Sequence, residues 1–218
     1  MSKIDRLDLI GLKKRFEEID ASSASKMKGK THYYNRETGS FLGQIGDTGT
    51  LKFVTTSEFY FALSTGNENA GCLFSSLNGS EQTYFLKQFL PYGANVDIEF
   101  NAQQIMGWGS VDGQFTKFYY NPYDVTFGDI KDFKNSMYHE IFHYENNHHG
   151  STFENESSAF NAMIEDSSYK DTTSAHKYDI ACLLYKLWKS ESLNETPGYT
   201  WEDACDKCKC NSNLPPPY

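Results

Sequence analysis

The clearest periodicity in this chain begins near residue 129, where apolar residues recur at helical spacing. The stripe consists of Phe133, Met137, Ile141 and Phe142. Asp129 precedes the stripe as an N-cap residue with Asp132 three positions later, and Gly150 follows as a helix stop. A stripe of this spacing is typical of a helix that buries one face. The pattern therefore predicts an amphipathic helix from about residue 130 up to Gly150.

A second helix is predicted directly after Gly150. Ser151 and Glu154 have the spacing of a capping box, which satisfies backbone N–H groups at a helix start. The apolar stripe that follows consists of Phe153, Phe160 and Met163. Because the turn between the two helices is short, an antiparallel αα-hairpin is expected. A third helix is predicted over residues 174–192, with one apolar face formed by Tyr178, Ala181, Leu184, Tyr185 and Trp188.

The first half of the chain has a different pattern. Between residues 33 and 125, aromatic and β-branched residues alternate with turn signals, as is typical of strands. Strands are expected at 51–56, 58–63, 96–100 and 114–120, and a helix at 82–90. Asp112 and Gly113 predict a hairpin turn before the last strand. Sheet first and helices afterwards indicates the α+β class, with an aromatic-rich antiparallel sheet followed by the helical half.

The chain is predicted to form one domain with an N-terminal extension. Residues 1–32 hold a short amphipathic pattern over 4–19 and a polar linker over 21–29. The domain, residues 33–218, has three consecutive parts: the sheet part over about 33–125, the helices over about 129–192, and a Cys- and Pro-containing tail over 193–218. With 218 residues, 39% of them hydrophobic, the chain is long enough to bury one core.

Charge and hydropathy exclude several classes of partner. Twenty basic and 29 acidic residues give a net charge of −9, which argues against nucleic acid as a partner. No stretch approaches 18 consecutive apolar residues, so no membrane insertion is expected. Asp5 and Asp8 interrupt the N-terminal apolar residues, so the sequence predicts no signal peptide. The protein is therefore expected to be cytoplasmic as made and to need a dedicated secretion system if it is exported.

The candidate chemistry lies in the first predicted helix, where His139, Glu140 and His143 form an H-E-x-x-H motif. On a helix, two imidazoles four residues apart project from one face and can hold one Zn²⁺, while the Glu reaches a water on the metal. Catalytic zinc sites normally take three protein ligands. The motif therefore predicts a zinc hydrolase with Glu140 as catalytic base, and it requires a third ligand.

Two residues compete for the position of third ligand. Glu156 lies in the middle of the second apolar stripe, and in an antiparallel hairpin it sits at about the height of His143. A carboxylate buried there without a partner would be strongly destabilising, and a zinc ion would neutralise it. His149 instead completes H-E-x-x-H-x-x-N-x-x-H, which resembles the metzincin pattern with Asn146 in place of Gly. The apolar stripe favours Glu156, with His149 as the alternative.

A wider stretch of sequence resembles a known family. The segment Tyr138 to Tyr144, a short loop with Gly150, and then Glu154 to Phe160 are similar to compact gluzincin-type metallopeptidase domains that occur as bacterial toxin or effector modules. The resemblance covers about residues 130–180. Further upstream, residues 32–43 weakly resemble the opening segment of bacterial effector domains.

The gluzincin resemblance implies His139, His143 and Glu156 as zinc ligands and Glu140 as the base. The larger thermolysin-like gluzincins carry a carboxylate four residues after the ligand Glu, and it orients a zinc-bound His. This chain has Phe160 there. Since zinc-bound histidines usually need a hydrogen-bond partner, that partner stays unassigned.

Two further groups of residues are candidates for chemistry. Gluzincin-like sites often carry an oxyanion donor downstream of the ligands, and the candidates here are Tyr169, His176 and Tyr178, each of which has packing as an alternative role. The other group is the cysteines Cys205, Cys208 and Cys210 of the tail. They could hold a metal, form a disulfide with Cys182 or Cys72, or stay free thiols. The spacing supplies no fourth ligand for a structural zinc.

The sequence thus leads to the hypothesis of a zinc metallopeptidase that cleaves a protein or peptide, a peptidoglycan peptide included. The resemblance adds a bacterial effector or toxin role, with an export or immunity partner. Two alternatives remain at this point: a metzincin-like peptidase that uses His149, and a non-catalytic binding module that a metal stabilises.

Overall fold

The computed structural model describes residues 30–46, 49–192 and 200–211. The amphipathic pattern over 4–19, the linker over 21–29 and part of the Cys- and Pro-containing tail lie outside the described residues. Helices and two small sheets form an α+β architecture in which the sheets precede the helical half, so the predicted fold class is confirmed. Within the described ranges, no helix has both the length and the apolar character that crossing a membrane requires.

The first sheet has the strand order β2-β1-β3. Strand β1 (Thr31–Asn35) pairs antiparallel with β2 (Phe41–Ile45) and parallel with β3 (Leu51–Val54). After β3 the chain forms helix α3 (Thr56–Thr65), although a strand was expected at 58–63. That expectation is wrong because Thr55 and Glu58 form a capping box, which starts a helix at this point.

The second sheet has the order β4-β6-β5. Strand β6 (Gln114–Tyr120) pairs parallel with β4 (Asp97–Phe100) and antiparallel with β5 (Met106–Val111). Asp112 and Gly113 both have positive φ, of 51° and 72°, which confirms the predicted tight hairpin. Each sheet therefore mixes one parallel and one antiparallel pair. The single antiparallel sheet expected from the sequence is wrong in this respect, because β1 and β3 run parallel with β2 between them in the chain, and β4 and β6 run parallel with β5 between them in the chain.

The helices largely follow the predicted pattern. Their bounds are α4 (Gly79–Lys87), α5 (Ile130–Glu145), α6 (Phe153–Glu165), α7 (Ser174–Ser192) and α8 (Trp201–Cys208), with single turns at η1 (Phe74–Ser76), η2 (Val125–Gly128) and η3 (Tyr169–Asp171). Asp129 caps α5, as predicted. The cap of α6 is Thr152, one residue later than the Ser151 of the predicted capping box. Helix α8 in the cysteine-containing tail was not predicted.

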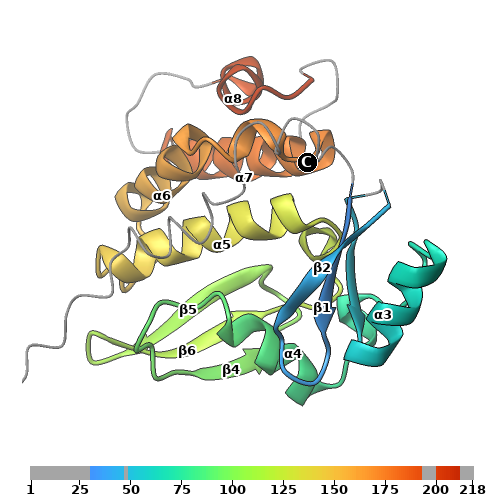
Figure 1. The fold of residues 1–218 in the computed structure, drawn as a ribbon. Coiled ribbons are helices and arrows are strands. Elements are labelled where there is room, and N and C mark those ends of the chain that lie inside the picture. The colour runs from blue at the N-terminus through green and yellow to red at the C-terminus, as the bar shows by residue number, and fades with distance from the viewer. Residues whose placement is uncertain (1–29, 47–48, 193–199, 212–218) are drawn as a thin grey trace, which may run out of the picture.

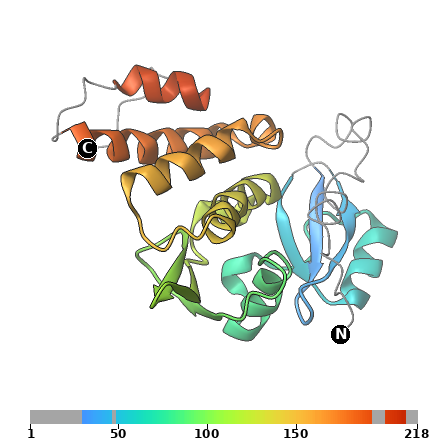
Figure 2. The same ribbon diagram turned by 90° about the vertical axis from the view of Figure 1, so that its left-hand side faces the viewer.

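The elements form layers around α5 (Figure 1). The second sheet lies on one side of α5 and α6 on the other, while α7 packs on α6 and α8 packs on α7. The view turned by 90° shows the same succession, with the first sheet and α3 beside the far end of α5 (Figure 2). Helix α5 is thus the element that the sheets and the helical layer share.

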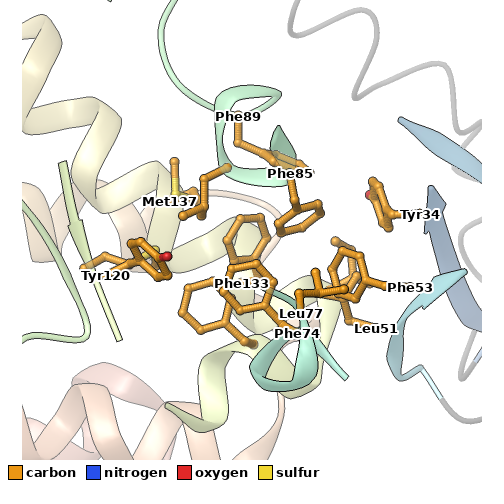
Figure 3. Close-up of a cluster of buried hydrophobic side chains, with 14 of the residues drawn as sticks. Tyr34, Leu51, Phe53, Phe74, Leu77, Phe85, Phe89, Tyr120, Phe133 and Met137 are labelled. Atoms are coloured by element: carbon orange, nitrogen blue, oxygen red, sulfur yellow. The ribbon is translucent and has the colours of Figure 1, made fainter. Parts of the chain in front are cut away.

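An aromatic cluster joins the first sheet, α4, the second sheet and α5 (Figure 3). Phe85 of α4 is fully buried at its centre. Its ring lies 4.9 Å from that of Phe53 on β3 and 5.0 Å from that of Phe133 on α5, between ring centroids. A separate cluster fills the space among α6, α7 and α8. The N-terminal end of α5 is therefore held by aromatic packing and its C-terminal half by the helical layer.

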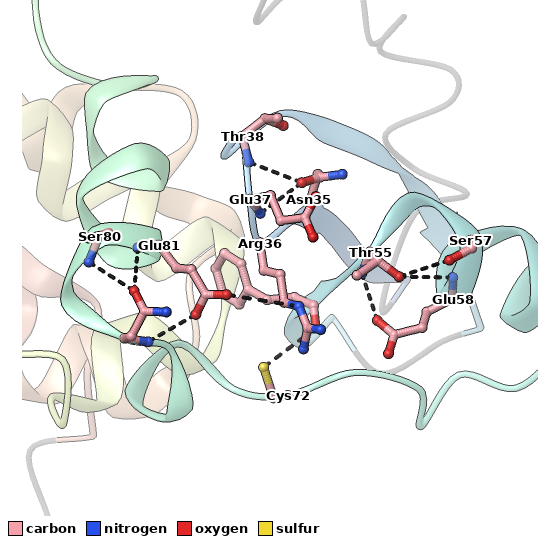
Figure 4. A network of polar contacts seen from close by, with 12 residues as sticks. Asn35, Arg36, Glu37, Thr38, Thr55, Ser57, Glu58, Cys72, Ser80 and Glu81 are labelled. Atoms are coloured by element: carbon pink, nitrogen blue, oxygen red, sulfur yellow. Dashed lines mark hydrogen bonds and ion pairs between the residues drawn. The ribbon is translucent and has the colours of Figure 1, made fainter.

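A polar network borders this core where β1 meets α4 (Figure 4). The side-chain oxygen of Asn35 accepts hydrogen bonds from the backbone N–H groups of Glu37 and Thr38 and so shapes the turn after β1. The guanidinium of Arg36 lies 3.9 Å from the carboxylate of Glu81 on α4. These contacts fix α4 against the first sheet, and α4 in turn supplies Phe85 to the core.

Replacing Phe85 by Ala is expected to lower the free energy of unfolding by about 3–5 kcal/mol, because a fully packed ring leaves a cavity. Tyr84, its exposed neighbour on the same helix, is the matched control, and Tyr84→Ala should change stability by less than about 0.5 kcal/mol. Urea denaturation followed by circular dichroism measures both. Equal losses in the two variants would contradict the assignment of Phe85 to the core.

Candidate metal centre

Three side chains from α5 and α6 converge on one point. The Nε2 atoms of His139 and His143 lie 3.1 Å apart. One carboxylate oxygen of Glu156 lies 3.4 Å from the Nε2 atom of His139 and 3.5 Å from that of His143. Among the described residues, this is the group of histidine, cysteine and acidic side chains whose ligand atoms are close enough to share a metal ion.

The three distances fit a tetrahedral zinc ion. Zinc binds histidine nitrogen and carboxylate oxygen at about 2.0–2.1 Å, so two ligand atoms at a tetrahedral angle lie about 3.3 Å apart. The observed separations of 3.1, 3.4 and 3.5 Å bracket this value. Two imidazoles and a carboxylate are also the donor set of many catalytic zinc sites, where a fourth position stays open. The residues present therefore fit a catalytic zinc ion.

The antiparallel packing of α5 against α6 brings the three ligands together. Contacts between the helices pair Asn135 with Met163, His139 with Phe160 and His143 with Glu156. Residue numbers rise along α5 as they fall along α6, which is the register of an antiparallel pair. His139 and His143 are one turn apart on α5, and Glu156 lies in the first turn of α6. The predicted αα-hairpin and the predicted height of Glu156 are confirmed.

Mutual electrostatics stabilise the ionised carboxylate at this point. Burial by itself raises the pKa of Glu156, but hydrogen bonds and charges from His139 and His143 outweigh it and hold the pKa well below its usual range. For His143, burial lowers the pKa, and the hydrogen bond and charge of Glu156 overcome that effect and raise it. The carboxylate thus stays negative between two nitrogen donors, and this arrangement favours a cation at the centre.

Glu140 lies beside the three ligands and is almost completely buried. Burial raises the pKa of its carboxyl group. The backbone carbonyl of Glu140 accepts a 2.6 Å hydrogen bond from the indole Nε1–H of Trp108 on β5. This bond fixes α5 against the edge of the second sheet. A carboxylate next to a metal position is placed to act as a general base.

A cavity of about 320 Å³ opens onto these residues between β5 and the helices. Its polar lining includes Glu140, the three candidate ligands, His148 and His149. One wall is the strand segment from Ile105 to Trp108 with the residues before it. The opposite wall is apolar and consists of Phe160, Met163, Ile180 and Leu183. The centre is therefore accessible from outside, as a catalytic site requires and a closed structural zinc site does not.

His149, the alternative third ligand, lies outside the ligand group. Its backbone carbonyl accepts a hydrogen bond of 3.0 Å from the Ser110 hydroxyl on β5. Its ring packs on that of Phe115, with centroids 4.5 Å apart. These two contacts hold His149 at the rim of the cavity, on the side of the sheet. The structure brings Glu156, and not His149, together with the two motif histidines.

His148 lies close to the candidate metal centre. No motif in the sequence distinguishes it from a surface residue. Just after helix α5, Asn147 has a left-handed conformation with φ 54°. The N–H of His148 bonds to the carbonyl of His143 at 2.9 Å, and the N–H of Asn147 bonds to the carbonyl of Tyr144 at 3.3 Å. This is a Schellman motif, which sets the residue after the left-handed position against the helix. The His148 ring accordingly lies 5.5 Å from that of His143, between centroids, and lines the cavity.

The left-handed residue also explains why α5 stops before Gly150. Helix α5 ends at Glu145, and Asn147 takes the conformation that Gly150 was expected to supply. Asn tolerates this conformation better than most residues. The two consecutive Asn residues after the helix were the signal in the sequence that could have located both the helix end and His148.

The three candidate oxyanion donors lie elsewhere, and each makes the packing contacts that the sequence allowed as the alternative role. The hydroxyl of Tyr169 donates to the backbone carbonyl of Cys208, under α8. The Nε2 atom of His176 pairs with the side-chain oxygen of Asn135 in the helix interface. The Tyr178 ring packs against Trp201 on α8. None of them lines the cavity.

The hydrogen-bond partner that zinc-bound histidines usually have is absent at His139. Its Nδ1 atom is buried and has no hydrogen-bond partner among the described residues. The ring of Phe160 lies 4.5 Å from the imidazole, between centroids. Phe160 therefore holds the His139 ring by packing, at the position where the larger gluzincins carry a carboxylate.

Comparisons of the chain with protein-family models, with curated protein sequences and with solved structures found no match.

Glu156→Ala is expected to lower zinc affinity at least about 10-fold, because it removes one of three ligands. Glu154→Ala, an exposed position on the same turn of α6, is the matched control and should bind zinc like the wild type. His149→Ala should also retain zinc. Competition with a fluorescent zinc chelator measures all four proteins. Loss of zinc in His149→Ala with retention in Glu156→Ala would transfer the third ligand to His149.

Proposed function

We propose that the protein is a zinc-dependent metallopeptidase with His139, His143 and Glu156 as metal ligands. The observation that carries this proposal is the set of three ligand-atom distances, which match a tetrahedral zinc site that opens onto a cavity. A zinc ion in this position acts as a Lewis acid and lowers the pKa of water near it. The gluzincin resemblance of residues 130–180 agrees with this donor set.

Glu140 has the role of proton carrier in this proposal. Its carboxylate takes a proton from the attacking water and passes it to the nitrogen of the leaving amine, so that the peptide C–N bond breaks. The raised pKa of Glu140 suits both steps, because the group must hold the proton between them. Trp108 positions Glu140 through its backbone and leaves the carboxylate free for the proton.

The shape of the cavity supports an extended polypeptide as substrate. Among the described strands, β5 pairs only with β6, so its other edge faces the cavity side of the sheet. An extended peptide can add to such an edge through backbone hydrogen bonds. The apolar wall of Phe160, Met163, Ile180 and Leu183 favours an apolar substrate side chain near the cleaved bond. The effector or toxin role, with its export or immunity partner, rests on the sequence resemblance.

Glu140→Gln is expected to retain zinc and stability and to lower the rate of peptide hydrolysis at least about 10²-fold, because it removes only the proton acceptor. Cleavage of denatured casein by zinc-loaded protein measures the rate, and emission spectrometry measures the metal. Glu145→Gln, an exposed position on the last turn of α5, is the control and should be as active as the wild type. Equal activity of wild type and Glu140→Gln would remove the base role from Glu140, and no activity in either would support the metal-stabilised binding module instead.

His148 is the residue best placed to donate a hydrogen bond to the substrate carbonyl oxygen. It lines the cavity beside His143, and the Schellman motif fixes its backbone. We therefore assign to His148 the oxyanion-donor role that the sequence had given to Tyr169, His176 or Tyr178. Such donors stabilise charge that develops only in the transition state.

His148→Ala should accordingly lower kcat by about 10²-fold while zinc content and KM change little. His149→Ala, which removes the neighbouring imidazole at the cavity rim, is the control and should keep kcat within about 3-fold of the wild type, since the His149 ring packs on Phe115 at the sheet side. Steady-state hydrolysis of a fluorogenic peptide gives both constants. A higher KM with an unchanged kcat would instead make His148 a substrate-binding residue.

A further inference from the structure

Four of the five cysteines gather at one place away from the metal centre. Cys182 lies on α7, Cys205 and Cys208 lie on α8, and Cys210 follows α8 directly. All four belong to the apolar cluster that joins α6, α7 and α8. The sequence placed Cys205, Cys208 and Cys210 in a tail without a fourth thiol, and the structure supplies that thiol from α7. The fifth, Cys72, lies beside β3.

The backbone at the end of α8 determines which two of these cysteines meet. Lys209 has φ 55°, the N–H of Cys210 bonds to the carbonyl of Cys205 at 3.0 Å, and the N–H of Lys209 bonds to that of Asp206 at 3.4 Å. This is again a Schellman motif, in which the residue after the left-handed position contacts the residue three before the helix cap. Here those two residues are Cys210 and Cys205. The Cys210 thiol is accordingly the side-chain hydrogen-bond neighbour of the Cys205 thiol.

We propose that Cys205 and Cys210 form a disulfide that closes the end of α8. The 3.0 Å hydrogen bond from the N–H of Cys210 to the carbonyl of Cys205 places the two residues side by side, and a disulfide requires such close backbones, with Cα atoms about 4.4–6.8 Å apart. A metal site is less well supported, because the thiols are not among the described groups whose ligand atoms lie close enough to share an ion. Cys208 is fully buried, and its carbonyl accepts a hydrogen bond from Tyr169.

The oxidant in this proposal is a small disulfide such as oxidised glutathione. The thiolate of one cysteine attacks it to give a mixed disulfide and one glutathione thiol. The second protein thiolate then displaces the other glutathione, and both thiol protons end on glutathione. Burial raises the pKa of the Cys205 thiol to about 12, so little thiolate exists in the folded protein. The bond is therefore expected to form during folding, before the thiols are buried.

A disulfide here would stabilise the wall of the metal-site cavity. Helix α8 packs on α7, where Trp201 contacts Tyr178 and Tyr185. Helix α7 contributes Ile180 and Leu183 to the apolar wall of the cavity. A disulfide at the end of α8 would hold α8 against α7. It would therefore limit movement of the cavity wall to which α7 contributes. This effect is independent of whether the cavity binds zinc or cleaves peptides.

Peptide mapping of the whole chain tests the pairing. The protein is refolded in a glutathione redox buffer, its free thiols are alkylated, and trypsin then places Cys182, Cys205 and Cys210 in the separate peptides 178–186, 190–207 and 210–218. We expect peptide 190–207 linked to 210–218, with a mass two hydrogens below the sum of the two. Linkage of 178–186 to 210–218, or alkylation of all five cysteines, would overturn the proposal.

Stability measurements give a second test that needs no mapping. The oxidised wild type should unfold at a midpoint about 4–8 °C above the reduced protein. Cys210→Ser should lose this difference, and the control Cys72→Ser should keep it. Metal analysis of the reduced proteins completes the test. The triple variant His139→Ala/His143→Ala/Glu156→Ala lacks the candidate zinc ligands. A metal ion that this variant still binds, and that the further change Cys210→Ser removes, would establish a thiolate metal site and overturn the disulfide.

Discussion

The contact of the Glu156 carboxylate with His139 and His143 is the constraint on which the helical half depends. A carboxylate in the interface of two helices is strongly destabilising unless a positive partner compensates for its lost hydration. The two imidazoles supply nitrogen atoms within 3.5 Å of the carboxylate oxygen and stabilise its ionised form. A divalent cation satisfies all three groups together. The same contacts that fix the spacing of α5 and α6 therefore also place three ligand atoms close enough to share one metal ion.

Buried polar contacts one and two turns earlier on α5 hold that spacing. The carboxylate of Asp132 accepts hydrogen bonds from the backbone N–H and the hydroxyl of Thr173, just before α7. Asn135 donates to the carbonyl of Met163 on α6 and pairs with His176 on α7. Because these groups are buried, a shift of either helix would leave them unsatisfied. The ligand positions are thus fixed by directional bonds as well as by apolar packing.

The sequence predicted the convergence of His139, His143 and Glu156 better than it predicted the sheets. The ligands lie on two helices joined by a short loop, so the helical period and the apolar stripe were enough to orient His139, His143 and Glu156. Strand pairing joins residues far apart in sequence, and no local pattern indicated that β3 and β6 would return parallel to β1 and β4. Within 58–63 the apolar residues fit a strand as well as a helix, and the capping residues before them decided the outcome.

His148 and Cys210 take positions that the sequence did not predict, and the two positions share one local cause. Both α5 and α8 end in a Schellman motif, at Asn147 and at Lys209, and neither end has the Gly that usually marks it. In each case the motif turns the next side chain back onto the helix: His148 onto His143, and Cys210 onto Cys205. The geometry is thus set by backbone hydrogen bonds, whatever the side chain at that position. The chemistry comes from the residues that occupy it, an imidazole beside the metal ligands and a thiol beside a thiol.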